Sequence, residues 1–123
     1  MTTTAAFDLV LGSRGPLLVY AEPAPMGGAI QVLALDRSGG SAGSPRAVFR
    51  PERGDELYPP DALEVAAAGG GGQLAVAWVE RHGTAFRALA THGSPEGAFA
   101  PPTELGPTER TLTGDRGHVA AAV

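Results

Sequence analysis

The sequence predicts an all-β protein, organised as two tandem four-stranded antiparallel units followed by the first strand of a third. Two observations predict this. The apolar residues fall in short segments rich in Val, Leu and aromatic side chains, as strands are, and these segments recur along the chain. The 18 glycines and 11 prolines among 123 residues supply the turns that so many short strands require.

The expected strands of the two units align in order. As four aligned pairs they are 7–12 with 65–69, 17–22 with 75–80, 29–35 with 85–91, and 45–52 with 102–109. Tyr20 then matches Trp78 at an offset of 58, while the first, third and fourth pairs align at 57, 56 and 57. A further VAAA segment at 119–122 would open a third copy. Four segments recurring in the same order at one period indicate a repeat protein.

The alignments divide the chain into five segments. We expect a disordered N-terminus, a first blade-like repeat, a linker, a second blade-like repeat, and a last segment that holds a linker and the first strand of a third repeat, at residues 1–6, 7–52, 53–60, 61–109 and 110–123.

The apolar character changes along each unit. The first strand is small and apolar on both faces, the second is bulky and apolar on both, and the third has one polar face. The fourth alternates, with Arg46, Val48 and Arg50 opposite Ala47 and Phe49. Apolarity on both faces predicts a sheet that is covered on both sides. This fall in apolar character from the first strand to the fourth favours β-propeller blades, in which the inner strand is closely packed and the outer strand is exposed to solvent. A two-sheet sandwich, whose strands alternate more regularly, is the alternative.

The segments G-x-LAVAWVE, FRALAT and FAPPTEL follow one another as the strands of a blade do. Here the chain resembles sialidase-like and related bacterial repeat propellers, over nearly all of residues 7–123. The Asp-box pattern S-x-D-x-G-x-x-W is absent, with only DRSGG at 36–40 similar to it, and the calcium-loop pattern D-x-D-x-D-G is absent too. The resemblance therefore supports the fold and says little about the activity.

Composition argues against several classes of function. A net charge of −4 gives no basis for binding nucleic acid or an anionic membrane surface. The chain has no cysteine, its three histidines lack the spacing of metal ligands, and no apolar run is long enough to span a membrane. The run Gly69–Gly72 lacks the Lys of a phosphate-binding loop and predicts a hairpin turn. We expect no cofactor, no metal and no catalytic site, and the localisation stays open because no signal peptide is visible.

Polar residues gather in the connections between units and between the middle strands. In propellers these connections share a face where ligands commonly bind, so the resemblance implies six candidate binding residues: Glu52, Arg53, Arg81, His82, Glu109 and Arg110. Alternatively, the recurring Glu-Arg pairs fix the linkers through local hydrogen bonds and turns. Trp78 and Tyr20 could stack on a sugar, but their apolar strand neighbours favour a place in the core.

The function predicted from the sequence is a non-enzymatic scaffold that binds a ligand or a protein, with glycans among the candidates. Two alternatives stay open: a fragment of a sialidase-like glycan-acting enzyme, and a self-assembling two-blade carbohydrate-binding lectin. Closed propellers hold about four to eight blades. We therefore expect the remaining blades of a longer chain, or further copies of this one, to cover the apolar faces that two blades leave open.

Overall fold

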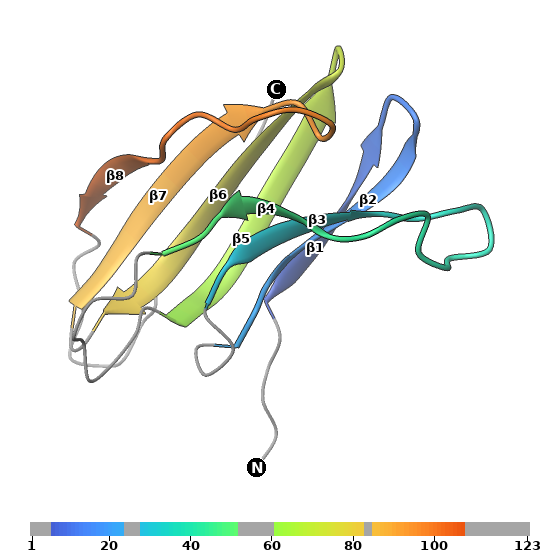
Figure 1. The fold of residues 1–123 in the computed structure, drawn as a ribbon. Coiled ribbons are helices and arrows are strands. Elements are labelled where there is room, and N and C mark those ends of the chain that lie inside the picture. The colour runs from blue at the N-terminus through green and yellow to red at the C-terminus, as the bar shows by residue number, and fades with distance from the viewer. Residues whose placement is uncertain (1–5, 24–27, 52–60, 83–84, 108–123) are drawn as a thin grey trace.

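The computed structural model describes residues 6–23, 28–51, 61–82 and 85–107, and every structural statement below concerns these residues. They form eight strands and the turns between them, and none of them is helical. The strands make two four-stranded antiparallel sheets, each in chain order, β1 to β4 in sheet 1 and β5 to β8 in sheet 2 (Figure 1). The predicted all-β class is confirmed. The expected linkers and the first strand of a third unit, at 53–60 and 110–123, lie outside the described residues.

All eight strands overlap the segments expected from the sequence. Sheet 1 contains β1 (Phe7–Gly12), β2 (Gly15–Ala21), β3 (Ile30–Ala34) and β4 (Arg46–Phe49). Sheet 2 contains β5 (Asp61–Gly70), β6 (Gln73–His82), β7 (Ala85–Gly93) and β8 (Thr103–Pro107). The strands of sheet 2 are longer because β5 and β6 pair along nearly their whole length.

The first hairpin of each sheet has a two-residue turn. Gly12 pairs with Gly15 in sheet 1, and Gly70 pairs with Gln73 in sheet 2. In sheet 2 the turn residues Gly71 and Gly72 both have positive φ, at 57° and 79°. This is the type I′ geometry, whose twist matches that of the flanking strands. The predicted hairpin in the glycine run is confirmed.

We expect Gly71→Asn to be tolerated and Gly71→Val to lower the free energy of unfolding by about 1–2 kcal/mol, because a β-branched residue strongly disfavours the left-handed region. A Cβ at position 71 would meet nothing within 4 Å, so the cost is one of backbone conformation alone. Urea denaturation measures it. The control is Gly43→Val, at an equally open position without positive φ, which should change stability by less than about 0.5 kcal/mol. Equal losses at both positions would contradict the turn assignment.

The strand registers show how the two sheets correspond. Tyr20 pairs with Gln31 and Trp78 pairs with Leu89, so both the second and the third strands match at a spacing of 58 residues. The hairpins closed by Gly12 and Gly70 place the first strands at 58 as well. The offsets of 57 and 56 expected for the first and third strands are therefore corrected to 58.

Each sheet has an irregularity between its third and fourth strands. In sheet 1 the register shifts between Ile30 and Gln31, and in sheet 2 it shifts between Arg87 and Leu89. When the two sheets are aligned at the spacing of 58 residues, the two register shifts fall at equivalent positions. A β-bulge inserts an extra residue, so in both sheets the fourth strand bends at an equivalent point.

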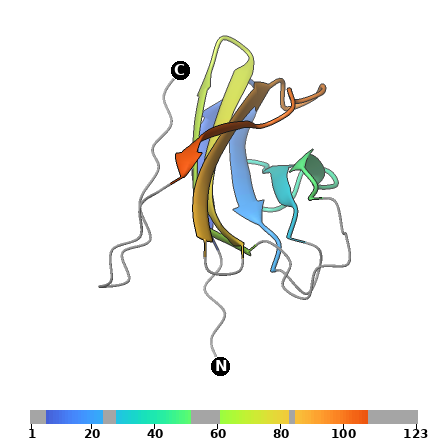
Figure 2. The ribbon, with the colours of Figure 1, turned by 90° about the vertical axis from the view of Figure 1, so that its left-hand side faces the viewer.

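The two sheets pack face to face and share one hydrophobic core (Figure 2). The buried residues of this core are Ala6, Leu17, Val19, Ala21, Ile30, Val32, Val48, Val65, Leu74, Val76, Trp78 and Leu89. Trp78 of β6 stacks on Phe49 of β4, with ring centroids 5.6 Å apart and an interplanar angle of 25°. Burial of Trp78 in this core confirms the expectation that it is a core residue. The same expectation is wrong for Tyr20, which lies on the opposite face of sheet 1, beside the exposed Phe7.

The fourth strand of sheet 1 does not alternate as expected. Ile30 pairs with Phe49 and Gln31 pairs with Ala47, which leaves Val48 as the extra residue of the bulge. Val48 is buried in the core, and Phe49 packs against the same core. The alternation predicted for Val48 and Phe49 is therefore wrong, because a bulge breaks the two-residue period on which it rested.

The faces turned away from the shared core differ. On sheet 1 this face exposes Phe7, Leu9 and Leu11, which are 62%, 59% and 75% exposed. On sheet 2, the face turned away from the shared core buries Ala77, Val79 and Ala88. Coverage of both faces, as predicted from the apolar pattern, is thus found at these positions of sheet 2 and not on sheet 1.

Candidate functional site at the loop end of the sheets

The strands β2, β4 and β6 finish at one end of the molecule, and β3, β5 and β7 begin at that end. In an antiparallel meander, alternate connections lie at the same end of the sheet. β1 and β5 run side by side in the same direction, because Asp8 contacts Ala67 and Gly69 lies against Leu11. The equivalent ends of the two sheets therefore coincide (Figure 1). We call this end, where β2, β4, β6 and β8 finish, the loop end, and the opposite one the hairpin end.

The six candidate binding residues are only partly described. Arg81 is the penultimate residue of β6, and it is exposed at the loop end. His82 is the last residue of β6, but its side chain is outside the described set. The other four candidates lie wholly outside the described residues: Glu52, Arg53, Glu109 and Arg110. A binding site formed by the six residues together stays a prediction.

A partly buried ion pair joins β6 to β7 near this end. The Arg87 Nε donates to the Glu80 Oε1 at 2.6 Å. The two residues are direct cross-strand partners, which brings their side chains together. The Glu80 side chain is 4% exposed and that of Arg87 is 38% exposed. A charge-assisted hydrogen bond of this kind holds the carboxylate in one position.

Glu22 occupies the matching position in sheet 1 at the end of β2. Its Oε1 lies 3.8 Å from the Arg50 Nη1 and accepts a hydrogen bond from the Ala29 backbone N–H at 3.3 Å. Sequence reasoning missed both arginine partners. Arg87 lies opposite Glu80 in the β6–β7 hairpin. The sequence alone could not identify this pair, because doing so requires the strand register.

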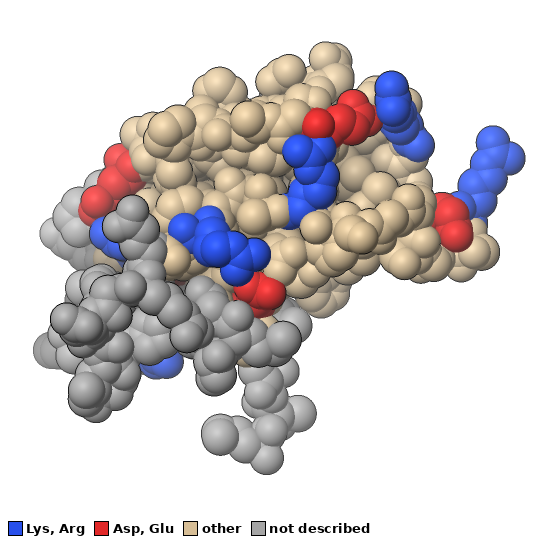
Figure 3. Space-filling model, in the orientation of Figure 1, with Lys and Arg blue, Asp and Glu red and all other residues tan. Residues whose placement is uncertain are grey.

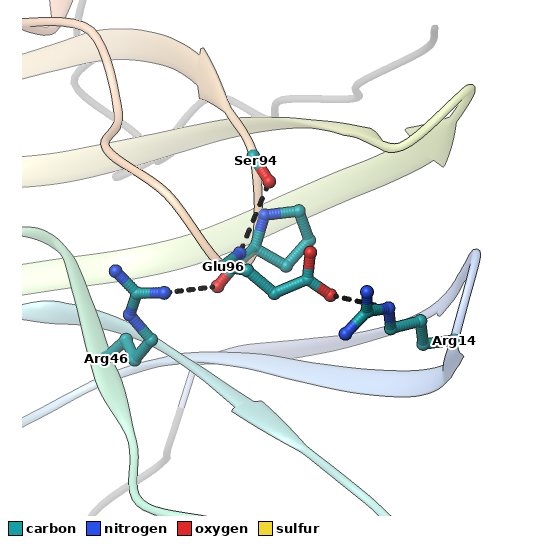
Figure 4. Close-up of polar contacts among 5 residues, drawn as sticks. Arg14, Arg46, Ser94 and Glu96 are labelled. Carbon is teal, nitrogen blue, oxygen red and sulfur yellow. Dashed lines mark hydrogen bonds and ion pairs between the residues drawn. The ribbon is translucent and has the colours of Figure 1, made fainter.

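The β7–β8 connection contacts sheet 1 at the hairpin end. The Arg46 Nη1 donates to the Pro95 carbonyl oxygen at 3.3 Å (Figure 4). The Arg46 Nη2 donates to the Gly97 carbonyl oxygen at 3.1 Å. The Arg14 Nε lies 3.4 Å from the Glu96 Oε1. These contacts are exposed, so each contributes little to stability, but together they fix the connection against sheet 1.

Asp8 links the first strands of the two sheets, β1 and β5. The Asp8 Oδ2 accepts a hydrogen bond from the Ala67 N–H of β5 at 2.9 Å, and its Oδ1 accepts one from the Leu9 N–H at 2.9 Å. Ala67 and Leu9 correspond to one another at the spacing of 58. A single carboxylate thus satisfies equivalent edge N–H groups in both sheets, groups that would otherwise be open to another chain.

Two ionisable groups have shifted pKa values. The Ser38 hydroxyl and the N–H groups of Gly40 and Ser38 donate to Asp36 and hold the pKa of that carboxyl below its ordinary value. These bonds close the DRSGG turn on itself. Burial, and then the Glu22 carboxylate, raise the pKa of Tyr20.

On the face shown in Figure 3, acidic and basic side chains lie close to one another in small separate groups, and the described residues there form no large area of one charge. Within the described ranges, no three His, Cys, Asp or Glu side chains form a group that could hold a metal ion. No described helix is long and apolar enough to cross a membrane.

No family model, curated protein or solved structure matches the chain. The function must therefore be inferred from the geometry of its own described residues.

Proposed function

We propose that the chain is a segment of a β-propeller-type repeat protein, and that it acts as a non-enzymatic scaffold that binds its partner at the loop end. Three features support a repeat. The second and third strands correspond at one spacing, the first hairpins have turns of equal length, and the bulges fall at equivalent places.

The main support for the proposal comes from the faces through which the two sheets pack. Trp78 corresponds to Tyr20 at the spacing of 58. Trp78 faces sheet 1, within the shared core. Tyr20 pairs with the exposed Phe7 and lies on the face of sheet 1 that is turned away from sheet 2. Equivalent residues therefore lie on opposite sides of the contact. Sheets that meet through unlike faces can continue to stack, as blades do, whereas a contact through like faces closes on itself.

The loop end suits binding better than proton transfer. Glu22 and Glu80 correspond at the spacing of 58, near the ends of β2 and β6, and each carboxylate contacts an arginine that orients it. The pairs fix the strand ends from which the connections leave. Connections held on a rigid sheet are where binding residues most often lie. Arg81, exposed beside them, is the described residue best placed to contact a ligand or a protein surface.

Titration of the ¹⁵N-labelled chain with a defined panel of neutral, sialylated and sulfated glycans and short peptides tests this proposal. We expect a binder in the panel to shift amide resonances at the loop end, around Glu80 and Arg81, and we expect Arg81→Ala to weaken its binding at least five-fold. Arg37→Ala, at an exposed position of the hairpin end, is the matched control and should leave the affinity unchanged. Shifts confined to the hairpin end, or no binding across the panel, would count against the proposal.

A further inference from the structure

Gln31 is the one buried polar side chain in the described part of the chain that makes no hydrogen bond. Three polar or charged residues are buried there, Gln31, Glu80 and Thr91, with exposed fractions of 9%, 3% and 5%. Glu80 is paired with Arg87, and the Thr91 hydroxyl donates to the Ala100 carbonyl oxygen. The described residues offer no such partner to the side-chain amide of Gln31. Burying an amide without a hydrogen bond costs free energy, so this group points to a partner from outside the chain.

The Gln31 side chain lies on the face of sheet 1 that is turned away from sheet 2. Ile30 and Val32, its neighbours along β3, are buried in the shared core. Successive side chains of a strand point to opposite faces, so that of Gln31 points the other way. Gln31 pairs with Tyr20, and Tyr20 pairs with Phe7, so the three residues form a row across β3, β2 and β1. The row is open to solvent at Phe7, which is 62% exposed.

Two charged side chains lie beside this row at the loop end. Glu22 follows Tyr20 by two residues, and its carboxylate, after burial, raises the pKa of the Tyr20 hydroxyl. Arg50 follows β4 and reaches across the start of β3 to Glu22, with 3.8 Å between its Nη1 and the Glu22 Oε1. These two charges offset one another. We call the whole group the loop-end corner of sheet 1: Phe7, Tyr20, Glu22, Gln31 and Arg50.

Sheet 2 shows that the fold does not require the polar groups of this corner. At the spacing of 58, Tyr20 corresponds to Trp78 and Gln31 corresponds to Leu89. Trp78 and Leu89 are both buried in the shared core, where sheet 2 packs on sheet 1. Sheet 1 thus carries a hydroxyl and an amide at two positions where the equivalent face of sheet 2 is apolar. A face that only packs against another sheet needs neither group, so the corner suits a polar ligand.

We propose that the loop-end corner of sheet 1 binds a neutral saccharide. A sugar ring has a face of C–H groups, which can lie on the Phe7 ring, and hydroxyls at its edge that both donate and accept hydrogen bonds. The Gln31 amide also donates and accepts, so a hydroxyl supplies the partner that it lacks. Glu22 accepts and Arg50 donates to neighbouring hydroxyls. An apolar ligand would leave the amide unpaired, and a charged one would disturb the balance between Glu22 and Arg50.

This site is separate from Arg81, which lies on β6 in the other sheet, so either proposal can fail while the other stands. A ligand at the corner also leaves the outer face of sheet 2 free of contact. The stacking of sheets through unlike faces can therefore continue beyond sheet 2 while the corner is occupied.

The side-chain amide signals of the ¹⁵N-labelled chain test the site directly. The chain has two glutamines, Gln31 and Gln73, and no asparagine, so these signals come from two residues alone. The probes are the methyl glycosides of glucose, galactose, mannose and N-acetylglucosamine. We expect at least one of them to shift the Gln31 side-chain signals and the Tyr20 backbone amide, and to leave the Gln73 signals at the hairpin end unchanged. Unchanged Gln31 signals with all four glycosides would overturn the proposal.

Gln31→Leu separates a binding role from a structural one, because leucine is the residue at the equivalent position of sheet 2. We expect this variant to bind the glycoside about ten-fold more weakly or worse, the cost of a lost hydrogen bond. We also expect a higher midpoint of urea denaturation, because an unpaired buried amide is removed. The control is Gln73→Leu, at an exposed position, which should change neither quantity.

Two outcomes of the variants would overturn the saccharide site. A lower midpoint for Gln31→Leu would mean that the amide stabilises the fold, so that its burial does not point to a ligand. Binding that Arg81→Ala weakens and Gln31→Leu leaves intact would support the proposed function at the loop end and place the saccharide there, away from the corner.

Discussion

Trp78→Ala should lower the free energy of unfolding by about 3–5 kcal/mol, the range for truncating a buried aromatic residue. Trp78 is fully buried in the core between the sheets, and its ring stacks on Phe49 at 5.6 Å. Alanine would leave a cavity lined from both sheets, and neither sheet can close it without breaking its own register. Urea denaturation followed by far-UV circular dichroism measures the loss. Fluorescence is unsuitable because Trp78 is the single tryptophan.

The control for this change is Leu105→Ala, at an exposed position, which should alter stability by less than about 0.5 kcal/mol. A double-mutant cycle with Phe49→Ala tests the contact between the sheets, for which we expect a coupling of about 0.5–1.5 kcal/mol. If Trp78→Ala is too unstable to measure, Trp78→Phe can replace it in the cycle. A loss below about 1 kcal/mol would place Trp78 at a surface and remove the stacked arrangement of the sheets.

The strands were predictable because their signals are local. Segments such as 75–80 combine β-branched and aromatic residues and end at turn residues, and the structure places a strand at each of them. The turn at Gly71 and Gly72 was predictable for a similar reason, since consecutive glycines favour two positive φ values. Neither inference needs contacts between residues distant in the sequence.

The register and the bulges could not be predicted, because they depend on pairing between strands. The sequence offset of 56 for the third strands follows residue similarity, whereas the hydrogen-bonded pairs of Tyr20 and Trp78 give 58. The bulge at Val48 also has no local signature, although it decides that Val48 and Phe49 both contact the core.

The apolar pattern likewise could not say which face of sheet 1 is open. Leu17 and Leu18 are adjacent residues of the same type in β2, yet Leu17 is buried in the core and Leu18 lies on the face of sheet 1 that is turned away from sheet 2. Hydrophobicity alone predicts two faces that avoid water. Only the position of sheet 2 distinguishes the covered face from the uncovered one.

The candidate site stays a prediction, and among the described side chains only that of Arg81 can be compared with it. The meander brings the expected connections to one end of the sheets, where Arg81 is exposed. The sequence did not reveal that Glu80 and Glu22 each contact an arginine, because that follows from the strand register and from the position of Arg50 after β4. Ion pairs thus hold the described strand ends at the loop end, next to Arg81, which is proposed to bind.

Arg87→Ala should lower the free energy of unfolding by about 2–4 kcal/mol, and by more than Glu80→Ala does. Removing one partner of a buried ion pair commonly costs about 3–5 kcal/mol, and the partial exposure of Arg87 reduces this. The asymmetry has a physical cause. Without Arg87 the buried Glu80 carboxylate has lost its partner, whereas without Glu80 the half-buried guanidinium of Arg87 can still reach water. Urea denaturation of both single variants at neutral pH measures the order.

Replacing both partners separates the cost of an unpaired charge from the worth of the pair. Glu80→Met combined with Arg87→Leu removes both charges and keeps most of the apolar volume, so it should recover most of the stability that Arg87→Ala loses. Such recovery would mean that the pair contributes little net stability and that its role is to fix the geometry of β6 and β7 at the loop end. If Glu80→Ala and Arg87→Ala cost the same and the double alanine variant loses the sum of the two, the residues are not coupled, and the ion pair does not organise the loop end.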